Sequence, residues 1–162
     1  MILFMATSAM MLTGCSVEIG ATNVTARAAS STEIQSDAEA SSYTPDGGAW
    51  VLLSALIAKE DVSRVSRWEV YPHVYVIDCS TGRDTNIGTE PQIDGVRFAD
   101  ANAVHAYLRD HSAKQVYEMQ SLVFARKGDF RTPQCMQFRG GSYTGQKIVE
   151  KRIPIRANRP LP

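Results

Sequence analysis

The chain has 162 residues, of which 17 are basic, 17 are acidic and 44% are hydrophobic, and its formal net charge is zero at pH 7. This length suits one compact domain plus some additional sequence and excludes a large multidomain enzyme. Zero net charge argues against a general nucleic-acid binder, and the hydrophobic content is too high for a wholly disordered protein.

Residues 1–14, with the sequence MILFMATSAMMLTG, form an uncharged apolar segment that ends immediately before Cys15. A membrane-spanning helix needs about 20 apolar residues, whereas the apolar part of a secretory signal needs roughly 7 to 15. The segment therefore indicates a signal peptide. An ordinary signal begins with Lys or Arg, but the first basic residue here is Arg27, which leaves the true start codon open. The alternative is a buried helix followed by an ordinary core thiol.

Leu12, Thr13, Gly14 and Cys15 resemble the lipobox of bacterial lipoproteins, in which an apolar residue and two small residues precede the cysteine. The resemblance implies a diacylglyceryl group on the Cys15 sulfur, cleavage before Cys15 and acylation, for example by palmitate, of the new amino group. Each buried CH₂ contributes about 0.8 kcal/mol, so a multiply acylated cysteine is a durable anchor. By resemblance to enterobacterial sorting, Ser16 favours the outer membrane, with the protein facing the periplasm.

Residues 15–48 are dominated by Ser, Ala, Thr and acidic side chains, with no aromatic residue before Tyr43. Such a composition buries too little apolar surface to offset about 1 to 2 kcal/mol of backbone entropy per residue. We therefore expect a lipid-anchored flexible tether with a reach of roughly 30 Å.

Residues 49–162 are expected to form one globular periplasmic domain. The apolar run Trp50–Ile57 fits either a buried strand or a short helix, because periodicity does not distinguish the two. Short connections between the later strands predict an α+β domain with a mainly antiparallel sheet, one packed helix and one disulfide. The other expected elements are a strand at 73–79, a helix at 100–110 capped by Asp100, and strands at 116–125, 135–138 and 147–155, with GGSYTG (140–145) as the last connection.

Cys79 and Cys135 are the two thiols that remain once Cys15 is assigned to lipid. In an oxidising periplasm an even number of cysteines predicts a disulfide, and closing a loop of about 57 residues is worth roughly 4 kcal/mol. The alternative is two independent buried thiols. We expect no metal or cofactor, because the sequence has no Cys-x-x-Cys and no closely paired histidines.

No common catalytic motif is present: the sequence lacks a Gly-x-Ser-x-Gly elbow, a His-Glu-x-x-His pair and a Walker loop. The three histidines are explained by ordinary positions at a strand start, on the expected helix and at its end. A small enzyme would need a diffuse acid/base site, for which the candidates are Asp78, Asp94, His73 and His105.

The C-terminal part is locally basic. From residue 126 onward there are nine basic and two acidic side chains, a net charge of +7, whereas residues 16–48 carry −4. Such a surface attracts an acidic protein or an anionic envelope polymer, and location excludes nucleic acid. The alternative is scattered solvated cations and, for GGSYTG, a plain hairpin turn. The predicted partner surface comprises Arg139, Tyr143, Lys147, Lys151 and Arg152.

The Cys79–Gly82 segment, with its Cys-x-x-Gly spacing, and the Ser/Gly/Tyr loop also resemble parts of periplasmic lysozyme inhibitors. Those inhibitors are essentially all-β, and the helix expected at 100–110 departs from that pattern. The sequence thus predicts a lipid-anchored envelope protein with a small non-enzymatic binding domain, of an immunity type or a hydrolase-inhibiting type. The alternative is a small periplasmic enzyme or scaffold acting on cell-wall material.

Overall fold

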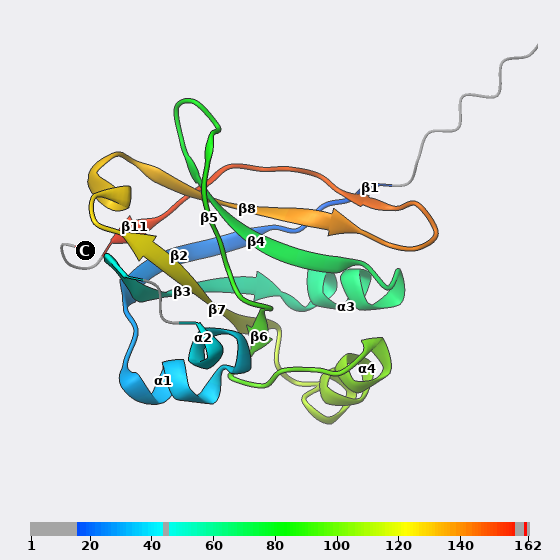
Figure 1. Ribbon diagram of the computed structural model, residues 1–162. Helices are drawn as coiled ribbons and strands as arrows, with labels where there is room; N and C mark the ends of the chain where they lie inside the picture. Colours follow the sequence, from blue (N-terminus) through cyan, green and yellow to red (C-terminus); the bar gives the residue numbers. More distant parts are fainter. Residues whose placement is uncertain (1–15, 44–45, 158–160, 162) are drawn as a thin grey trace, which may run out of the picture.

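The computed structural model describes residues 16–43, 46–157 and 161 (Figure 1). The predicted signal peptide and Cys15 lie outside the described residues. Strands predominate and form two largely antiparallel sheets. The α+β class is therefore confirmed. The expectation of one packed helix is wrong, because the described residues include four α-helices and a short 3-10 helix.

The first sheet has the strand order β1-β9-β8-β4-β5, and β10 also pairs with β8. Its centre is the antiparallel pair β4 (Tyr71–Asp78) and β8 (Gln134–Gly141). Alternate residues of both strands, such as Val74 and Phe138, are buried in the core, as the two-residue period of a strand requires. The shorter strands are β1 (Ser16–Val17), β5 (Asp84–Ile87), β9 (Lys147–Ile148) and β10 (Ile153–Pro154), so the single strand predicted at 147–155 is two short ones.

The second sheet has the order β11-β2-β3-β7-β6. Its two long strands, β3 (Gly48–Ala58) and β7 (Val116–Arg126), pair along their whole length, so the ambiguous run Trp50–Ile57 is a strand. The run is continuously apolar because the sheet is covered on both faces: Leu53 contributes to the core between the sheets, whereas Leu52 packs with Leu122 on the opposite face. The remaining strands are β2 (Ala21–Ala28), β6 (Gln92–Ile93) and β11 (Arg156–Ala157).

The two sheets pack face to face, and the chain passes from one to the other through short connections between β1 and β2, β5 and β6, and β10 and β11 (Figure 1). At the β5 crossing, Gly88 forms a bridge with Val123 of β7. A Cβ at Gly88 would collide with the Ser121 hydroxyl, so this close approach of the two sheets requires glycine.

The helices occupy two separate places. Helices α1 (Ser31–Ser36) and α2 (Ala38–Ser42) cover the outer face of the second sheet, while α3 (Lys59–Arg67) and α4 (Ala101–Asp110) lie beside each other at the other end of the molecule (Figure 1). The predicted helix at 100–110 is confirmed. Asp100 is its N-cap, and its Oδ1 accepts a hydrogen bond from the Ala103 amide at 2.9 Å.

The predicted flexible tether at 15–48 is wrong for the residues that the structure describes. Strand β2 pairs with β3, and Val17, Val24 and Ala26 are buried in the core. Helix α1 begins with a capping box between Ser30 and Glu33, which organises the polar segment locally. The folded domain therefore includes β1 and β2, and position 49 lies inside a strand instead of at a domain boundary.

The predicted disulfide between Cys79 and Cys135 is confirmed, with a Cα–Cα distance of 5.0 Å. It joins the residue that follows β4 to the second residue of β8. Because these strands are already hydrogen-bonded neighbours, the disulfide fixes one end of an existing pair.

Candidate functional site

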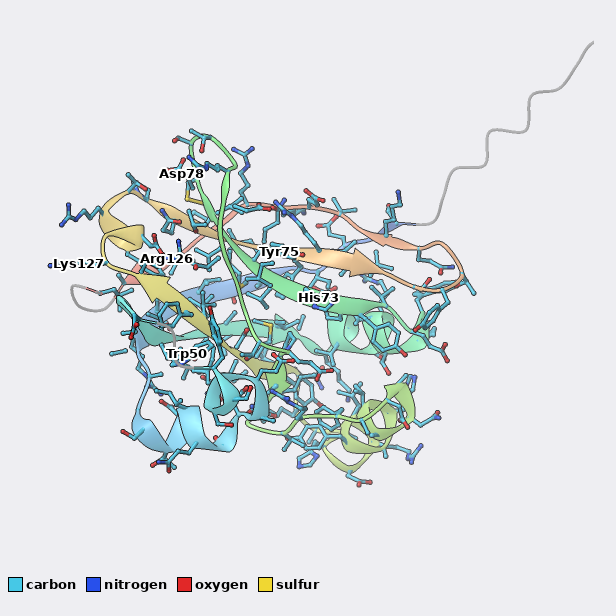
Figure 2. The ribbon with its side chains drawn as sticks, in the orientation of Figure 1. Trp50, His73, Tyr75, Asp78, Arg126 and Lys127 are labelled. Carbon is cyan, nitrogen blue, oxygen red and sulfur yellow. A yellow bond between two sulfur atoms is a disulfide. The ribbon has the colours of Figure 1, made fainter. Side chains whose placement is uncertain are left out.

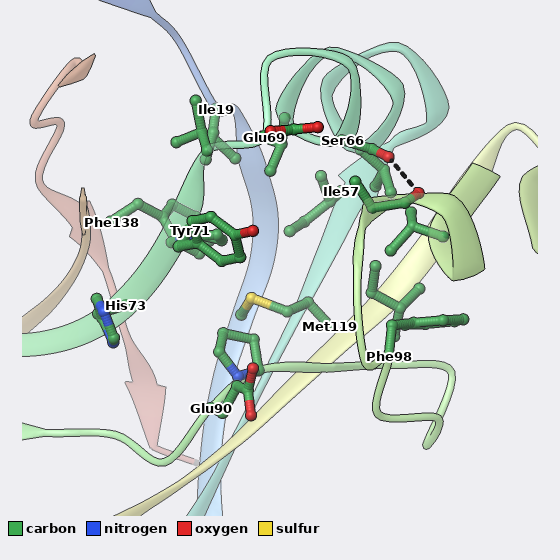
Figure 3. A pocket seen from close by; sticks show the side chains of 18 of the residues that line it. Ile19, Ile57, Ser66, Glu69, Tyr71, His73, Glu90, Phe98, Met119 and Phe138 are labelled. Carbon is green, nitrogen blue, oxygen red and sulfur yellow. Dashed lines mark hydrogen bonds between the residues drawn. The ribbon is translucent and has the colours of Figure 1, made fainter. Parts of the chain in front are cut away.

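A cavity of about 440 Å³ lies between the two sheets at the end covered by α3 and α4 (Figure 3). Its wall is mostly apolar. The residues that form it come from both sheets and both helices, and include Ile57, Val62, Val104, Met119 and Phe138. Concave, largely apolar spaces of this size are the usual form of a ligand-binding site.

The helical side of the cavity is held together by a hydrogen bond between α3 and α4. The Ser66 hydroxyl donates to the carbonyl oxygen of Ala101 at 3.0 Å, and this bond is drawn in Figure 3. Ser66 itself is buried, so the bond is largely shielded from water. Val62 and Val65 of α3, at helical i, i+3 spacing, then present their side chains to the cavity and the core.

The polar residues that line the cavity are predominantly acidic, and none of the described lining residues is Lys or Arg. Asp61 and Asp100 have structural partners, because Asp61 accepts the Gly20 amide at 2.8 Å and Asp100 caps α4. The other three lining acids, Glu39, Glu69 and Glu90, are exposed. An apolar wall with acidic groups favours an apolar ligand that carries positive charge.

Two arginines form ion pairs beside the cavity, one with a lining acid and one mainly with an acid outside the lining. Arg64 pairs with Asp61 at 3.0 Å, and Arg97 pairs with Asp37 at 2.7 Å while its other terminal nitrogen lies 4.0 Å from Glu90. The charge of Glu90 is therefore only weakly compensated.

The four candidate acid/base residues do not come together. His73 lines the cavity, whereas Asp78 lies at the other end of β4 (Figures 2 and 3). Hydrogen bonds from Ser80, Thr81 and Thr132 hold the pKa of Asp78 well below its usual range, and the same carboxylate organises the β4–β5 turn. Asp78 is therefore a structural residue.

Asp94 is also held in structural contacts. Partial burial raises the pKa of its carboxyl, but hydrogen bonds from Lys114, the Glu118 amide and the Tyr107 hydroxyl outweigh burial and lower that pKa overall. The contacts measure 2.6 Å to Lys114 and 2.9 Å to Tyr107. His105 lies on α4 and does not line the cavity.

The predicted partner residues are distributed over the first sheet. Tyr143, in the β8–β9 turn, is 94% exposed, and Lys147 follows in β9. Arg139 pairs with Asp84 and lies over the Tyr75 ring, and Lys151 pairs with Glu18. Arg152 donates to the Cys79 carbonyl oxygen at 3.0 Å, beside the disulfide. Arg139, Lys151 and Arg152 are therefore each engaged by groups of this chain.

The two segments that resemble lysozyme inhibitors lie at opposite ends of the first sheet. Gly82 is in the turn that follows β4, next to Arg152. The GGSYTG loop follows the far end of β8, because Tyr71 pairs with Gly141 and Asp78 pairs with Gln134. The two segments therefore do not form a shared surface.

Within residues 16–43, 46–157 and 161, no helix has the length and apolar character needed to cross a bilayer, and no three His, Cys, Asp or Glu side chains are grouped to hold a metal ion. No protein family, no curated protein and no solved structure matches the chain.

Sequence reasoning missed the cavity because it missed α3. The available signal was the pair Val62 and Val65 within a charged stretch, which gives one apolar stripe on an otherwise polar helix. The other lining residues are far apart in sequence and are brought together by the packing of the sheets.

Proposed function

We propose that the chain is a lipid-anchored cell-envelope protein whose folded domain is a non-enzymatic binding module, with the cavity between the sheets and α3–α4 as its binding site. The observation that carries this proposal is a largely apolar cavity whose polar lining is predominantly acidic, with no Lys or Arg among its described lining residues. Binding needs such shape and charge, whereas catalysis also needs reactive groups held in mutual contact.

The proposed anchor is acylated Cys15, which places the protein on the outer membrane facing the periplasm. The Cys79–Cys135 disulfide supports an oxidising compartment. The lipobox resemblance supports the anchor itself. An anchored domain meets its partners close to the membrane, as an immunity-type or hydrolase-inhibiting protein must.

The partner that fits the cavity is a protein that inserts an apolar side chain flanked by basic residues. The apolar side chain gains free energy by leaving water, at about 25 cal/mol per Å² of buried apolar area. Basic neighbours gain from Glu69 and Glu90, which are exposed beside the cavity. The basic C-terminal surface is a weaker candidate for an acidic partner, because Arg139 and Lys151 already pair with acids of this chain.

The alternative of a small enzyme or scaffold acting on cell-wall material has narrower support. Of Asp78, Asp94, His73 and His105, only His73 lines the cavity. Glu69 and Glu90 are the acids that an enzyme would use beside it. A His73→Gln variant that keeps its binding affinity but loses an activity on cell-wall fragments would favour this alternative.

The proposed binding site is tested with two matched peptides, acetyl-Lys-Phe-Lys-amide and acetyl-Glu-Phe-Glu-amide, titrated into the full acylated chain in nanodiscs by ligand-observed NMR. We expect the basic peptide to bind about fivefold or more tightly, because exposed ion pairs contribute roughly 0.2 to 1 kcal/mol each. The double variant Glu69→Gln, Glu90→Gln should remove this preference.

The matched control is Glu60→Gln, which neutralises an exposed acid of α3 that does not line the cavity. It should leave both affinities unchanged. Equal affinity of the wild-type protein for the two peptides, or an equal loss in the Glu60 control, would contradict the proposal.

A further inference from the structure

One row of residues runs across the first sheet at the end where the described chain begins. Ser16 of β1 pairs with Lys147 of β9, Lys147 with Gly141 of β8, and Gly141 with Tyr71 of β4. Adjacent strands are about 4.8 Å apart, so Tyr71 lies roughly 14 Å from Ser16 along this row. In Figure 1 this end also contains the β8–β9 turn and the turn between α3 and β4.

Exposed aromatic side chains gather at this end. Tyr143 is 94% exposed, Tyr71 48% and Trp68 43%. The rings of Tyr71 and Tyr143 meet edge to face with centroids 6.1 Å apart. Tyr and Trp place an apolar ring and a polar group side by side, so exposed examples of both suit a boundary between water and lipid.

The charges around these rings are mixed but include two exposed cations, Arg67 and Lys147. The acids at this end include Glu69, which lines the cavity, and Glu18, which follows β1 and pairs with Lys151. Lys and Arg side chains beside aromatic rings are attracted to the anionic phospholipids of a membrane surface.

We propose that this end, comprising Trp68, Tyr71, Tyr143 and Lys147, lies against the lipid headgroups of the membrane that holds the protein. The inference rests on the proposed acylation of Cys15. Because β1 begins at Ser16, immediately after the acylated residue, no flexible spacer separates the lipid from the folded domain. One residue extends about 3.3 to 3.6 Å, so the row that starts at Ser16 is held at the headgroup layer.

This orientation has a consequence for the cavity. Tyr71 belongs to the membrane-facing end and also lines the cavity. Glu69, two residues earlier in the chain, lines the cavity as well. The cavity therefore lies beside the bilayer surface, and its partner approaches along the membrane instead of from the free periplasm.

The two tryptophans of the chain provide the test. Trp68 belongs to the membrane-facing end, whereas Trp50 lies near the start of β3 and packs beside α1 and α2 (Figure 2). Trp50→Phe leaves Trp68 as the reporter, and Trp68→Phe leaves Trp50. Each full acylated chain is reconstituted into vesicles of phosphatidylethanolamine and phosphatidylglycerol that contain a lipid spin-labelled at its headgroup.

We expect the emission of Trp68 to be quenched roughly twofold or more, while that of Trp50 is nearly unchanged. The wild-type protein, which carries both tryptophans, gives a second measurement without any substitution. Its quenching should lie between the values of the two variants. Iodide, a quencher that stays in the water, should give the opposite pattern. It should quench the emission of Trp68 less when vesicles are present than when they are absent.

Failure of the inference and failure of the anchor are separable by vesicle flotation. A protein that floats with the vesicles but shows equal quenching of Trp50 and Trp68 is anchored in another orientation, which overturns the inference alone. A protein that does not float, and that behaves like its Cys15→Ala variant, lacks the proposed anchor, which overturns both.

Discussion

Arg97 donates a hydrogen bond to the carboxylate of Asp37 at 2.7 Å, and Asp37 is 1% exposed. The same carboxylate caps α2 by accepting the amides of Glu39 and Ala40, both at 3.0 Å. Arg97 lies in the segment between β6 and α4, near the cavity residue Phe98. The contact therefore ties the N-terminal helices to the half of the molecule that contains the cavity.

Asp37→Ala should destabilise the domain by about 3 kcal/mol, because it breaks a buried ion pair and removes a helix cap together. Urea denaturation followed by circular dichroism measures the change in the free energy of unfolding. Asp46→Ala removes an exposed acid in the turn before β3 and should change that free energy by less than about 0.5 kcal/mol. Equal effects of the two variants would show that the Asp37 contact contributes little.

The disulfide should contribute about 4 kcal/mol, the value that loop-closure entropy assigns to a loop of this length. The double variant Cys79→Ala, Cys135→Ala should unfold at a clearly lower urea concentration than the wild-type protein. Adding dithiothreitol should lower the wild-type midpoint and leave the midpoint of the variant unchanged. A wild-type midpoint that does not respond to a reductant, with free thiols detected throughout, would mean that the bond does not form in the protein.

Acid should weaken the N-terminal part of the fold through Glu33. The hydrogen bond from Arg27 lowers the pKa of Glu33 from 4.5 to about 2, assisted by Ser30 and opposed by burial. Because this pKa is lower in the folded state, the stabilisation is complete above pH 4.5 and disappears as the pH falls towards 2. Allowing for solvent screening, it amounts to about 1 kcal/mol.

The measurement compares the free energy of unfolding of the wild-type protein and Glu33→Gln between about pH 2 and 7. The two curves should be separated at neutral pH and approach each other as the pH falls below 4.5. A difference between the two curves that stays constant over this range would show that the pKa of Glu33 is the same in the folded and unfolded protein.

We expect the main role of Arg139 to be stabilising the fold, not binding a partner. Its guanidinium lies 4.5 Å from the centre of the Tyr75 ring and 2.7 Å from Asp84. Arg139→Ala should therefore cost about 1 to 2 kcal/mol of stability. Lys147→Ala and Tyr143→Ala, at an exposed strand end and loop tip, should change thermal unfolding little. A Tyr143→Ala protein as destabilised as Arg139→Ala would contradict this division of roles.

The elements that sequence reasoning found are those with a strong local signal. β4 carries β-branched and aromatic residues, and α4 has Asp100 as a cap and an apolar face. The two cysteines were expected to pair because an even number of thiols in an oxidising compartment predicts a disulfide. These features depend on a few neighbouring residues. The apolar run in β3 stayed ambiguous because covering both faces of the sheet removes the alternation that marks a strand.

The N-terminal segment was misread because its order comes from contacts distant in sequence. In β2, only Val24 and Ala26 are buried, and the strand is held by antiparallel pairing with β3, which follows it only after α1 and α2. Composition does not report such pairing. The local clue was the Ser30-x-x-Glu33 capping box, which indicates a helix start within a segment otherwise rich in Ser and Ala.

A substitution that fills the cavity distinguishes an effect on binding affinity from an effect on the stability of the fold. Val104 of α4 lines the cavity, and Val104→Phe adds an apolar ring where the structure holds unoccupied space. Overpacking a filled core costs about 1 to 3 kcal/mol, so a stability change well below that range would show that the ring enters the cavity. Affinity for the basic peptide should then fall severalfold.

Asn102→Phe places the same ring on an exposed position of α4 that does not line the cavity, and it should leave the affinity unchanged. A stable Val104→Phe protein that binds the peptide as tightly as the wild-type protein would move the binding site elsewhere.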